Sequence, residues 1–467
     1  MSGEVLFEDA PRFDAEVPVA IIGAGAAGLT AALAAREAGA EPLVLERDPV
    51  PRGSTSLSAG LIPAAGTRFQ RAHGIADDAA AFAADLHRKA HGKADPALVE
   101  TLAAQAGATV EWLADRFGLP FSLVHDFDYP GHSHRRMHGL PSRSGAELVD
   151  RLRSAAEARG IALLTEARVT TLVADRARRI RGLIAERPDG ARERIGCGAL
   201  VLACCGFGAN KALVARHIPA LANALYFGHP GNEGEAVLWG EALGAALRDL
   251  TGHQGHGSVA HPQGILITWA VIMEGGFQVN LRGERFWNES SGYSEAGEAV
   301  LRQPEGLAFD IFDARIAAIA RQFEDFRSAE AAGAVLTADS PEALAARMRV
   351  PADAFAATFA AVEAAKRAGS ADRFGRDWSR SPAPLLPPLH AVRVTGALFH
   401  TQGGLAVDRT ARVLRPDGTP LPNLFAAGGA ACGVSGPDAS GYLSGNGLLS
   451  ATVLGRLAGE NAARLAA

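Results

Sequence analysis

The spacing of apolar and polar positions changes several times along the chain, and the first change marks a strand–helix–strand unit. Residues 17–22 (VPVAII) are almost continuously apolar, which is typical of a buried strand. A glycine-rich turn and an Ala/Leu-rich helical stretch to about Ala38 follow, with Gly39 at the position of a helix C-cap. A second apolar run at 42–46 (PLVLE) ends in a glutamate. This order predicts two parallel strands joined by a helix.

Helical and strand-like patterns alternate through the rest of the first half. Helical periodicity dominates at about 79–116 and at 145–159. Short strand-like runs follow at 162–164, 168–173, 180–185 and 199–203. From about Leu250 to Leu389 the pattern weakens into Gly/His turns, one short β-like piece (GGFQVN) and helices such as 352–368.

Strand-like patterning returns after a proline-rich crossing at 381–388, which holds four prolines. The later runs lie at 391–394, 405–407 and 424–426, and a helix closes the chain at about 447–465. We therefore predict an α/β fold in which residues 1–248 and 389–467 form one discontinuous Rossmann-like domain. An α+β substrate (capping) domain is inserted at 249–388.

Composition excludes several classes of protein. The 467 residues are 48% hydrophobic and carry a net charge of −5 with no strongly basic stretch, so nucleic-acid binding is not expected. No run reaches the roughly 18 apolar residues of a membrane span, and the acidic first residues do not form a signal peptide. The cysteines are expected to be reduced core thiols without metal-ligand spacing: Cys197, Cys204, Cys205 and Cys432. We expect a cytoplasmic location and no metal site.

The turn after the first strand carries the clearest chemistry. Its sequence Gly23-Ala24-Gly25-Ala26-Ala27-Gly28 has the G-x-G-x-x-G spacing. In such turns the first glycine permits the tight bend, the second lets the backbone approach a pyrophosphate, and the third lets the helix pack on the strand. Glu46, at the end of the second strand, is placed to accept a hydrogen bond from a ribose hydroxyl. Together these residues predict a dinucleotide site.

Three further segments resemble the fumarate reductase/succinate dehydrogenase flavoprotein family: 53–60 (GSTSLSAG), 200–208 (LVLACCGFG) and 420–428 (PLPNLFAAG). The likeness continues, in the family's order, at 231–236, 283–289, 374–376, 400–404 and 455–459. The chain is identified as a member of this family, to which the 3-ketosteroid Δ1-dehydrogenases also belong. The resemblance implies FAD, and loop 53–60 has no histidine for covalent attachment, so we expect FAD to be non-covalent.

The predicted cofactor-binding residues follow these segments. They are Gly23, Gly25, Ala26, Ala27, Gly28, Glu46, Arg47, Ser54, Thr55, Ser58, Ala59, Gly60, Val169, Ala203, Gly206, Gly428, Gly429, Asn446, Gly447, Leu448 and Leu449. The last helix begins near Asn446, and its positive end would stabilise negative charge on the reduced flavin.

The resemblance also implies a reaction, in which a hydride moves between flavin N5 and one carbon of a C–C or C=C bond. Fumarate reductases have one arginine four residues after the N-E of R-F-x-N-E and another before L-G-G-N. This chain has Tyr293 and Tyr442 at those places, and the acid of a family T-E pair becomes Trp269. Arginine grips a carboxylate with a charged fork, whereas tyrosine offers one neutral donor and a flat ring. We therefore expect a neutral, cyclic ketone.

The ketosteroid dehydrogenases suggest roles for these residues. Residues 288–293 (NESSGY) fit their N-E-S-x-x-Y motif, whereas 442–446 (YLSGN) is one residue shorter than their Y-x-G-x-G. We expect Tyr442 and backbone N–H near Gly445 to hold the ketone oxygen, and Tyr293 to take the α proton. His400 (of H-T-x-G-G) and His261 (of H-P-T) are expected to hydrogen-bond the substrate.

The remaining candidates are weaker. We interpret the other histidines of these loops as solvated or lid residues: His132, His134, His138, His253 and His256. Tyr129 lies in a loop (DFDYPGHSHRRMHG) that is a candidate cover for the site.

Two alternatives stay open. The first is a flavin-dependent reductase of an enone or unsaturated acid, and the second is a flavin-binding electron-transfer subunit without its own substrate. No second dinucleotide motif is evident, so the expected external electron acceptor is a quinone, a dye-like acceptor or oxygen.

Overall fold

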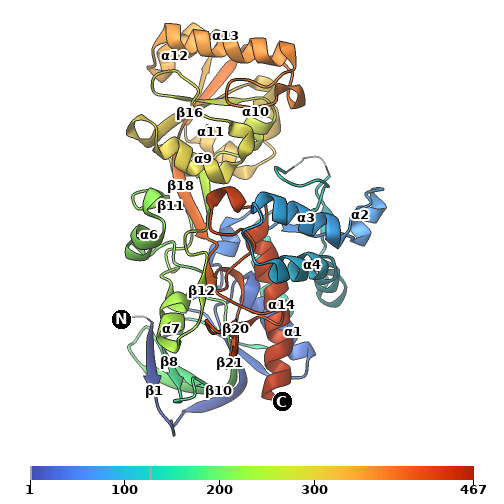
Figure 1. Cartoon of the computed structure of the whole chain (residues 1–467), viewed down its shortest axis with the longest axis vertical. Helices are drawn as coiled ribbons and strands as arrows, with labels where there is room; N and C mark the ends of the chain where they lie inside the picture. Colours follow the sequence, from blue (N-terminus) through green and yellow to red (C-terminus); the bar gives the residue numbers. More distant parts are fainter. Residues whose placement is uncertain (1–2, 126–128) are drawn as a thin grey trace. The chain divides into compact units, whose positions relative to one another are not determined.

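The computed structural model describes residues 3–125 and 129–467 (Figure 1). The chain divides into two compact units. The first contains Met1–Pro219, Gly228–His253 and His400–Ala467, and the second contains Ala220–Phe227 and Gln254–Phe399. The first unit therefore joins segments from both ends of the sequence.

A mixed sheet forms the centre of the first unit. Across the described residues it has nine strands, seven of them in the order β1-β8-β9-β10-β2-β3-β7, with β21 on β10 and β20 on β21. The bounds are β1 Glu4–Phe7, β2 Ala15–Ile22, β3 Pro42–Leu45, β7 Ala162–Leu164, β8 Arg168–Ala174, β9 Ile180–Glu186, β10 Arg192–Leu202, β20 Arg412–Leu414 and β21 Pro420–Ala426. β2, β3, β10 and β21 are parallel, with Leu200 level with both Ala20 and Leu424. The predicted fold in which the two ends of the chain share one sheet is confirmed.

Two helices on this sheet lie side by side, α1 (Ala26–Glu37) and α14 (Asn446–Ala466) (Figure 1). A Cβ atom added to Gly455 would lie 2.5 Å from the Ala27 carbonyl oxygen, and one on Gly459 would lie 2.0 Å from that of Ala31. Both contacts advance by four residues, so the helices run parallel in backbone contact. Since Gly455 is level with Ala27, α14 starts about 12 Å before α1 along their common direction.

Further helices and short strands complete the first unit. They are α2 Arg68–Ala72, α3 Ala79–Lys89, α4 Pro96–Phe117, α5 Gly145–Glu157, α6 Lys211–His217 and α7 Glu235–Leu243, with β4 Ile62–Pro63, β5 Ser122–Leu123, β6 Met137–Gly139, β12 Leu247–Arg248 and β19 Gly404–Leu405. The helical pattern over 79–116 thus forms two helices. α3 ends at Lys89, and Asp95 caps α4 by accepting from the N–H groups of Ala97 and Leu98.

The second unit contains its own sheet. Most of its strands were not predicted, because hydrophobic periodicity is weak over 250–389. Its described strands are β11 Leu225–Tyr226, β13 His253–Ala260, β14 Ile265–Leu266, β15 Phe277–Asn280, β16 Leu307–Asp313, β17 Val335–Ala338 and β18 Leu389–Thr401, of which β13 and β18 reach across the unit's boundary. Its helices are α8 Ala270–Met273, α9 Tyr293–Leu301, α10 Ala314–Ala320, α11 Glu324–Ala331, α12 Pro341–Met348 and α13 Ala352–Ala368.

The expectation of Gly/His turns at 253–260 is wrong, because this segment is the buried strand β13. Its glycines give α9 room to approach. A Cβ on Gly257 would lie 2.4 Å from that of Ala296, and one on Gly255 would lie 2.6 Å from the Ser294 carbonyl oxygen. A strand that needs glycine for close packing does not show the alternation by which strands are recognised.

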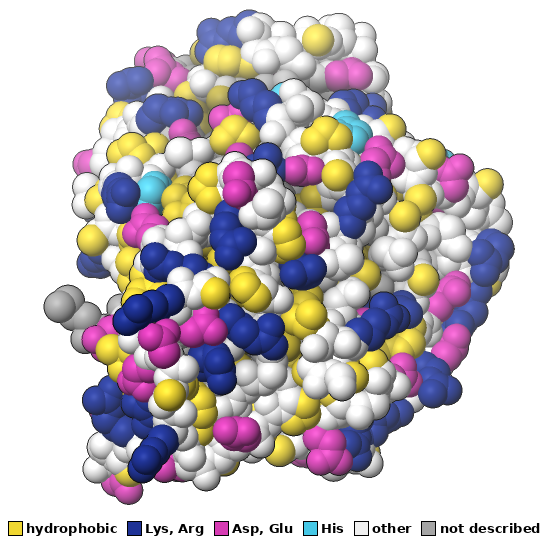
Figure 2. Space-filling view, turned by 60° about the horizontal axis from the view of Figure 1, so that its bottom comes forward, with side chains coloured by type: hydrophobic (Ala, Val, Ile, Leu, Met, Phe, Trp, Pro, Cys, Tyr) yellow, Lys and Arg dark blue, Asp and Glu magenta, His cyan; other side chains and the backbone are white. Residues whose placement is uncertain are grey.

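The surface agrees with the small net charge. On the face in Figure 2, basic and acidic side chains are interspersed. Among the described helices, none combines the length and the apolar character needed to cross a membrane.

The helix contact generates the first prediction. We expect Gly459→Ala to force α1 and α14 apart, lowering the free energy of unfolding by about 1–3 kcal/mol, the range for overpacked interiors. Thermal unfolding of the FAD-loaded protein measures the change. Leu465→Ala, at an exposed position of the same helix, is the control. An unchanged melting temperature for Gly459→Ala would contradict this close approach.

Candidate flavin site and active site

The glycine turn and the start of α1 form a backbone cradle. Gly23 has a φ of +103°, and a Cβ there would lie 2.5 Å from the Ala203 carbonyl oxygen. On Gly28, a Cβ would lie 1.8 Å from the Gly23 carbonyl oxygen. α1 begins after Gly25, which has no side chain to cap the first turn. The N–H groups and the positive end of this helix are therefore suited to an anionic ligand such as a pyrophosphate.

The second predicted loop lies against this cradle. Residues Ser54–Leu57 form one 3-10 turn, η1, and the Thr55 hydroxyl accepts a hydrogen bond from the Ala26 N–H at 3.0 Å. The Ser54 hydroxyl accepts from the Asn232 side-chain amide at 2.8 Å. A Cβ on Gly60 would lie 2.6 Å from the Ser144 carbonyl oxygen, so this loop is packed tightly on the start of α5. Loop 53–60, identified by resemblance, is thus structurally joined to the G-x-G-x-x-G turn.

Glu46 ties the end of β3 to the glycine turn. Its Oε2 accepts from the Ala24 N–H at 2.8 Å, and its Oε1 accepts from the Asp48 N–H at 3.1 Å. Burial raises the pKa of this carboxyl group. Each oxygen has a second lone pair, so the group can still accept from a ribose hydroxyl. Arg47 instead donates to the Gly231 carbonyl oxygen at 2.7 Å.

The other predicted cofactor residues gather from distant segments of the first unit. Val169 lies in β8, Ala203 and Gly206 follow β10, and Gly428 and Gly429 follow β21. A Cβ on Gly206 would lie 2.0 Å from the Thr401 hydroxyl, and one on Gly429 would lie 3.0 Å from the Gly206 nitrogen. The end of β18 therefore meets the segments that follow the parallel strands β10 and β21, at the edge where open α/β sheets bind their ligands.

The start of α14 provides a second helix end. Gly445 has a φ of +87° and supplies no side-chain cap. Asn446 is fully buried, and within the described part of the chain its Oδ1 has no hydrogen-bond partner. The remaining predicted residues here, Gly447 to Leu449, form the first turn of the helix.

These two helix ends suit FAD. The two ends are offset by about 12 Å along the helix axes, so one ligand can reach both only if it is elongated, and it must present negative charge or acceptors at both places. The turn at 23–28 would hold the pyrophosphate, Glu46 a ribose, and the first turn of α14 the acceptor edge of the flavin ring.

Tyr442 and His400 meet beside this second helix end. Their ring centroids are 5.4 Å apart in an edge-to-face arrangement, and Tyr442 is only 7% exposed. A Cβ on Gly447 would lie 3.2 Å from His400 Nε2 and 3.8 Å from the Tyr442 hydroxyl. Burial lowers the pKa of His400 to about 4, so its imidazole is uncharged near neutral pH. The structure thus brings Tyr442 and His400 together at Gly447, whereas the predicted Gly445 packs against Pro63 and Met137.

In the second unit, the ring beside Tyr293 is His256. Tyr293 opens α9, and its ring stacks on His256 with centroids 5.1 Å apart; Phe399 also stacks on His256, at 5.1 Å. His256 Nδ1 accepts from the Ser258 N–H at 3.1 Å, which leaves the proton on Nε2. Burial lowers the pKa of His256 to about 3.

The structure does not bring His261 to this cluster. His261 lies on an exposed turn past the end of β13, five residues from His256, which is about 16 Å along an extended strand. The sequence interpretation chose His261 for its H-P motif and missed His256. Residues 253–260 are mostly polar or glycine, so the sequence offers no hydrophobic pattern that would have marked His256 as buried.

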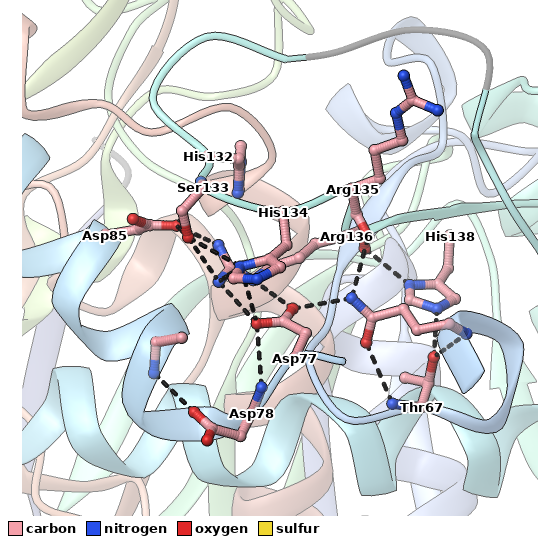
Figure 3. Close-up of polar contacts among 12 residues, drawn as sticks. Thr67, Asp77, Asp78, Asp85, His132, Ser133, His134, Arg135, Arg136 and His138 are labelled. Carbon is pink, nitrogen blue, oxygen red and sulfur yellow. Dashed lines mark hydrogen bonds and ion pairs between the residues drawn. The ribbon is translucent and has the colours of Figure 1, made fainter. Parts of the chain in front are cut away.

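The segment 129–139 is fixed by a buried ion cluster, shown in Figure 3. Arg136 donates to both Asp77 oxygens, at 2.7 and 2.8 Å, and also pairs with Asp85. Burial alone would raise the pKa of Asp85, but hydrogen bonds from Ser133 and Arg136 hold it at about 2. His132 at the start of this segment donates from Nε2 to the Ser444 carbonyl oxygen at 2.9 Å. The cluster thus anchors a chain segment beside the Tyr442–Gly445 loop.

The interpretation of the loop histidines as solvated is wrong for three of them. His138, His253 and His256 are 0–5% exposed. His138 packs against Phe69 and shares a hydrogen bond of 2.8 Å with the Thr67 hydroxyl, and burial lowers its pKa to about 4. Tyr129 packs against a small cluster of Leu61, Val124 and Met137. Residues 126–128 of the candidate covering loop lie outside the described residues.

The fold and the cradle define a dinucleotide-binding protein, and comparison with known proteins gives the family. A family model described as "FAD binding domain" matches residues 18–448. The chain belongs to this family, with homologues among the fumarate reductase/succinate dehydrogenase flavoproteins, and it is an FAD-dependent oxidoreductase of the kind that acts on C–C bonds.

Three relatives illustrate the range of the family. The chain is 32% identical, over 96% of its length and 74% of the relative's, to a probable fumarate reductase (Ifc3) of Shewanella frigidimarina. An open flavocytochrome c3 fumarate reductase superposes with a TM-score of 0.82 at 31% identity, covering 97% of this chain and 79% of that one. A 3-ketosteroid-Δ4-(5α)-dehydrogenase of Rhodococcus jostii RHA1 superposes with a TM-score of 0.79 at 26% identity, covering 99% and 100%.

The Glu46 contacts generate the second prediction. We expect Glu46→Gln to weaken FAD binding by about 10–100-fold. The variant keeps one acceptor oxygen but turns an NH₂ group towards a backbone N–H that loses its partner, which costs about 1–3 kcal/mol. Fluorescence of released FAD at equilibrium measures the affinity. Glu41→Gln, at an exposed carboxylate before the same strand, is the control, and equal affinities would contradict this role for Glu46.

Proposed function

We propose that this protein is an FAD-dependent dehydrogenase that forms a C=C bond next to the carbonyl of a neutral, cyclic ketone. The observation that carries the proposal is the pair Tyr442 and His400, which offers two uncharged polar groups beside the start of α14. A carboxylate would call for a charged, bidentate partner, whereas a ketone oxygen needs only neutral donors.

The roles of the side chains follow from this chemistry. Tyr442 and backbone N–H near Gly445 hold the ketone oxygen, and the charge that develops on it is stabilised by these donors and by the start of α14. Tyr293 takes the proton from the α carbon. Free tyrosine has a pKa of about 10, so Tyr293 needs a lowered pKa or a proton relay to act as a base near neutral pH. FAD, when bound, supplies the hydride acceptor, and an external quinone, dye-like acceptor or oxygen then takes the electrons.

The whole-length likeness to a ketosteroid dehydrogenase supports a ketone substrate. The higher identity to a probable fumarate reductase favours a second candidate, reduction of an activated C=C bond. Because tyrosine stands at both arginine positions of the fumarate reductases, an enone is the better substrate for that candidate than a dicarboxylate.

The third prediction tests the tyrosines. Under anaerobic conditions, saturated cyclic ketones are expected to bleach the flavin of the wild-type protein. We expect Tyr293→Phe and Tyr442→Phe to slow bleaching by about 10²–10⁴-fold, the usual loss for a group that transfers or stabilises charge. Rapid-mixing absorbance of the oxidised flavin measures the rate.

Tyr226→Phe in the short strand β11 is the matched control. Wild-type rates in both site variants would contradict the assignment of the tyrosines. Reoxidation of photoreduced flavin by enones, without bleaching by any ketone, would favour the reductase. If neither ketones, enones nor unsaturated acids react, an electron-transfer subunit without its own substrate would be favoured.

A further inference from the structure

The buried polar groups behind His400 form one connected line that the proposed reaction does not use. The Asn446 side-chain amide donates to the Ser435 hydroxyl at 3.0 Å, and that hydroxyl donates to Gln402 Oε1 at 2.8 Å. Gln402 Nε2 lies 2.7 Å from His400 Nδ1. Asn446, Ser435 and Gln402 are 0%, 1% and 6% exposed, so protein groups, not bulk water, satisfy these atoms.

The hydrogen bonds along this line all run one way, with each group donating to the next from Asn446 towards His400. The side-chain oxygen of Gln402 accepts the Ser435 hydroxyl proton, and its NH₂ group is therefore the part that faces His400. An NH₂ group can only donate, so Nδ1 of His400 must accept. A neutral imidazole that accepts at one nitrogen carries its proton on the other.

The backbone keeps Gln402 in this position. Its N–H donates to the Gly252 carbonyl oxygen at 2.8 Å, and its carbonyl oxygen accepts from the Gly433 N–H at 2.8 Å. The Thr401 carbonyl oxygen, at 3.4 Å from Nδ1, is a much weaker competitor for that nitrogen than the amide at 2.7 Å.

We propose that Gln402 is a positioning residue that holds His400 in the Nε2–H tautomer, so that His400 presents an uncharged hydrogen-bond donor beside Tyr442 and Gly447. The use of that donor on a ketone oxygen rests on the proposed function, whereas the tautomer does not. The titratable groups that act on His400 from the packed elements of this unit are Tyr442 and His253. Neither is a carboxylate, and burial is the main reason that the pKa of His400 is low and the imidazole neutral.

The first measurement is the tautomer itself. Histidine labelled with ¹⁵N in the FAD-loaded wild-type protein gives separate resonances for protonated and bare ring nitrogens, and His400→Asn identifies those of residue 400. We expect a protonated Nε2 and a bare Nδ1, unchanged between pH 6 and 9. A protonated Nδ1 of His400 in the wild-type protein would overturn the proposal.

The second measurement uses Gln402→Glu, which places an acceptor where the NH₂ group was. We expect the proton to move to Nδ1 and the pKa of His400 to rise. Nε2 then donates only while the imidazole is charged. The rate of flavin bleaching by a ketone should therefore fall by about 10²–10³-fold as the pH rises through the new pKa, since losing one donor to a developing oxyanion costs about this much. The bleaching rate of the wild-type protein should not fall with pH in this way.

Two further variants complete the test. Gln402→Leu removes the contact without adding charge. We expect it to lower the bleaching rate at every pH, without a new dependence of the rate on pH. Gln322→Glu makes the same chemical change on the surface and should match the wild type. Unchanged ¹⁵N resonances in Gln402→Glu would overturn the proposal. If no ketone reacts, the resonances still decide the tautomer, so failure of the proposed function is distinguishable from failure of this inference.

Discussion

The backbone contact between α1 and α14 is the constraint on which the site depends. Gly455 and Gly459 let the two helices touch at the carbonyl oxygens of Ala27 and Ala31, which fixes their register. Register in turn fixes how far the start of α14 lies beyond the start of α1 along the helix axes, about 12 Å, because each residue advances a helix by about 1.5 Å. One end faces the glycine turn, and the other carries Asn446 beside Tyr442 and His400. A larger residue at either glycine would change the distance over which a dinucleotide has to reach.

The sequence was sufficient for the glycine turn and the elements around it because their chemistry is local. The turn at 23–28, the strand ending at Glu46 and the last helix each follow from a few adjacent residues, and the observed bounds differ from the expected ones by only a few positions. The pairing of β21 with β10 is not local, and it was anticipated through resemblance alone. No pattern within either strand encodes that Leu200 lies beside Leu424.

The second unit was harder to predict for a physical reason. β13 is buried on every residue, yet it contains two histidines, a glutamine, a serine and two glycines, so its polarity suggests solvent. Its polar atoms are satisfied inside the protein, as when the Ser258 N–H donates to His256. Hydrophobic patterning detects burial only where side chains are apolar. It therefore overlooked His256, the imidazole that stacks on Tyr293.

The Tyr442–His400 pair and the Tyr293–His256 pair share one property, a buried histidine without charge. His400 and His256 both have pKa values lowered far below the ordinary 6.5, because desolvation penalises the imidazolium. A buried imidazolium would bind anions strongly, and its charge would change with pH. A neutral imidazole is instead a dipole whose direction is set by its hydrogen-bond partner. For His256 that partner is the backbone N–H of Ser258. For His400 it is the side chain of Gln402, so one residue decides whether the ring donates or accepts at the start of α14.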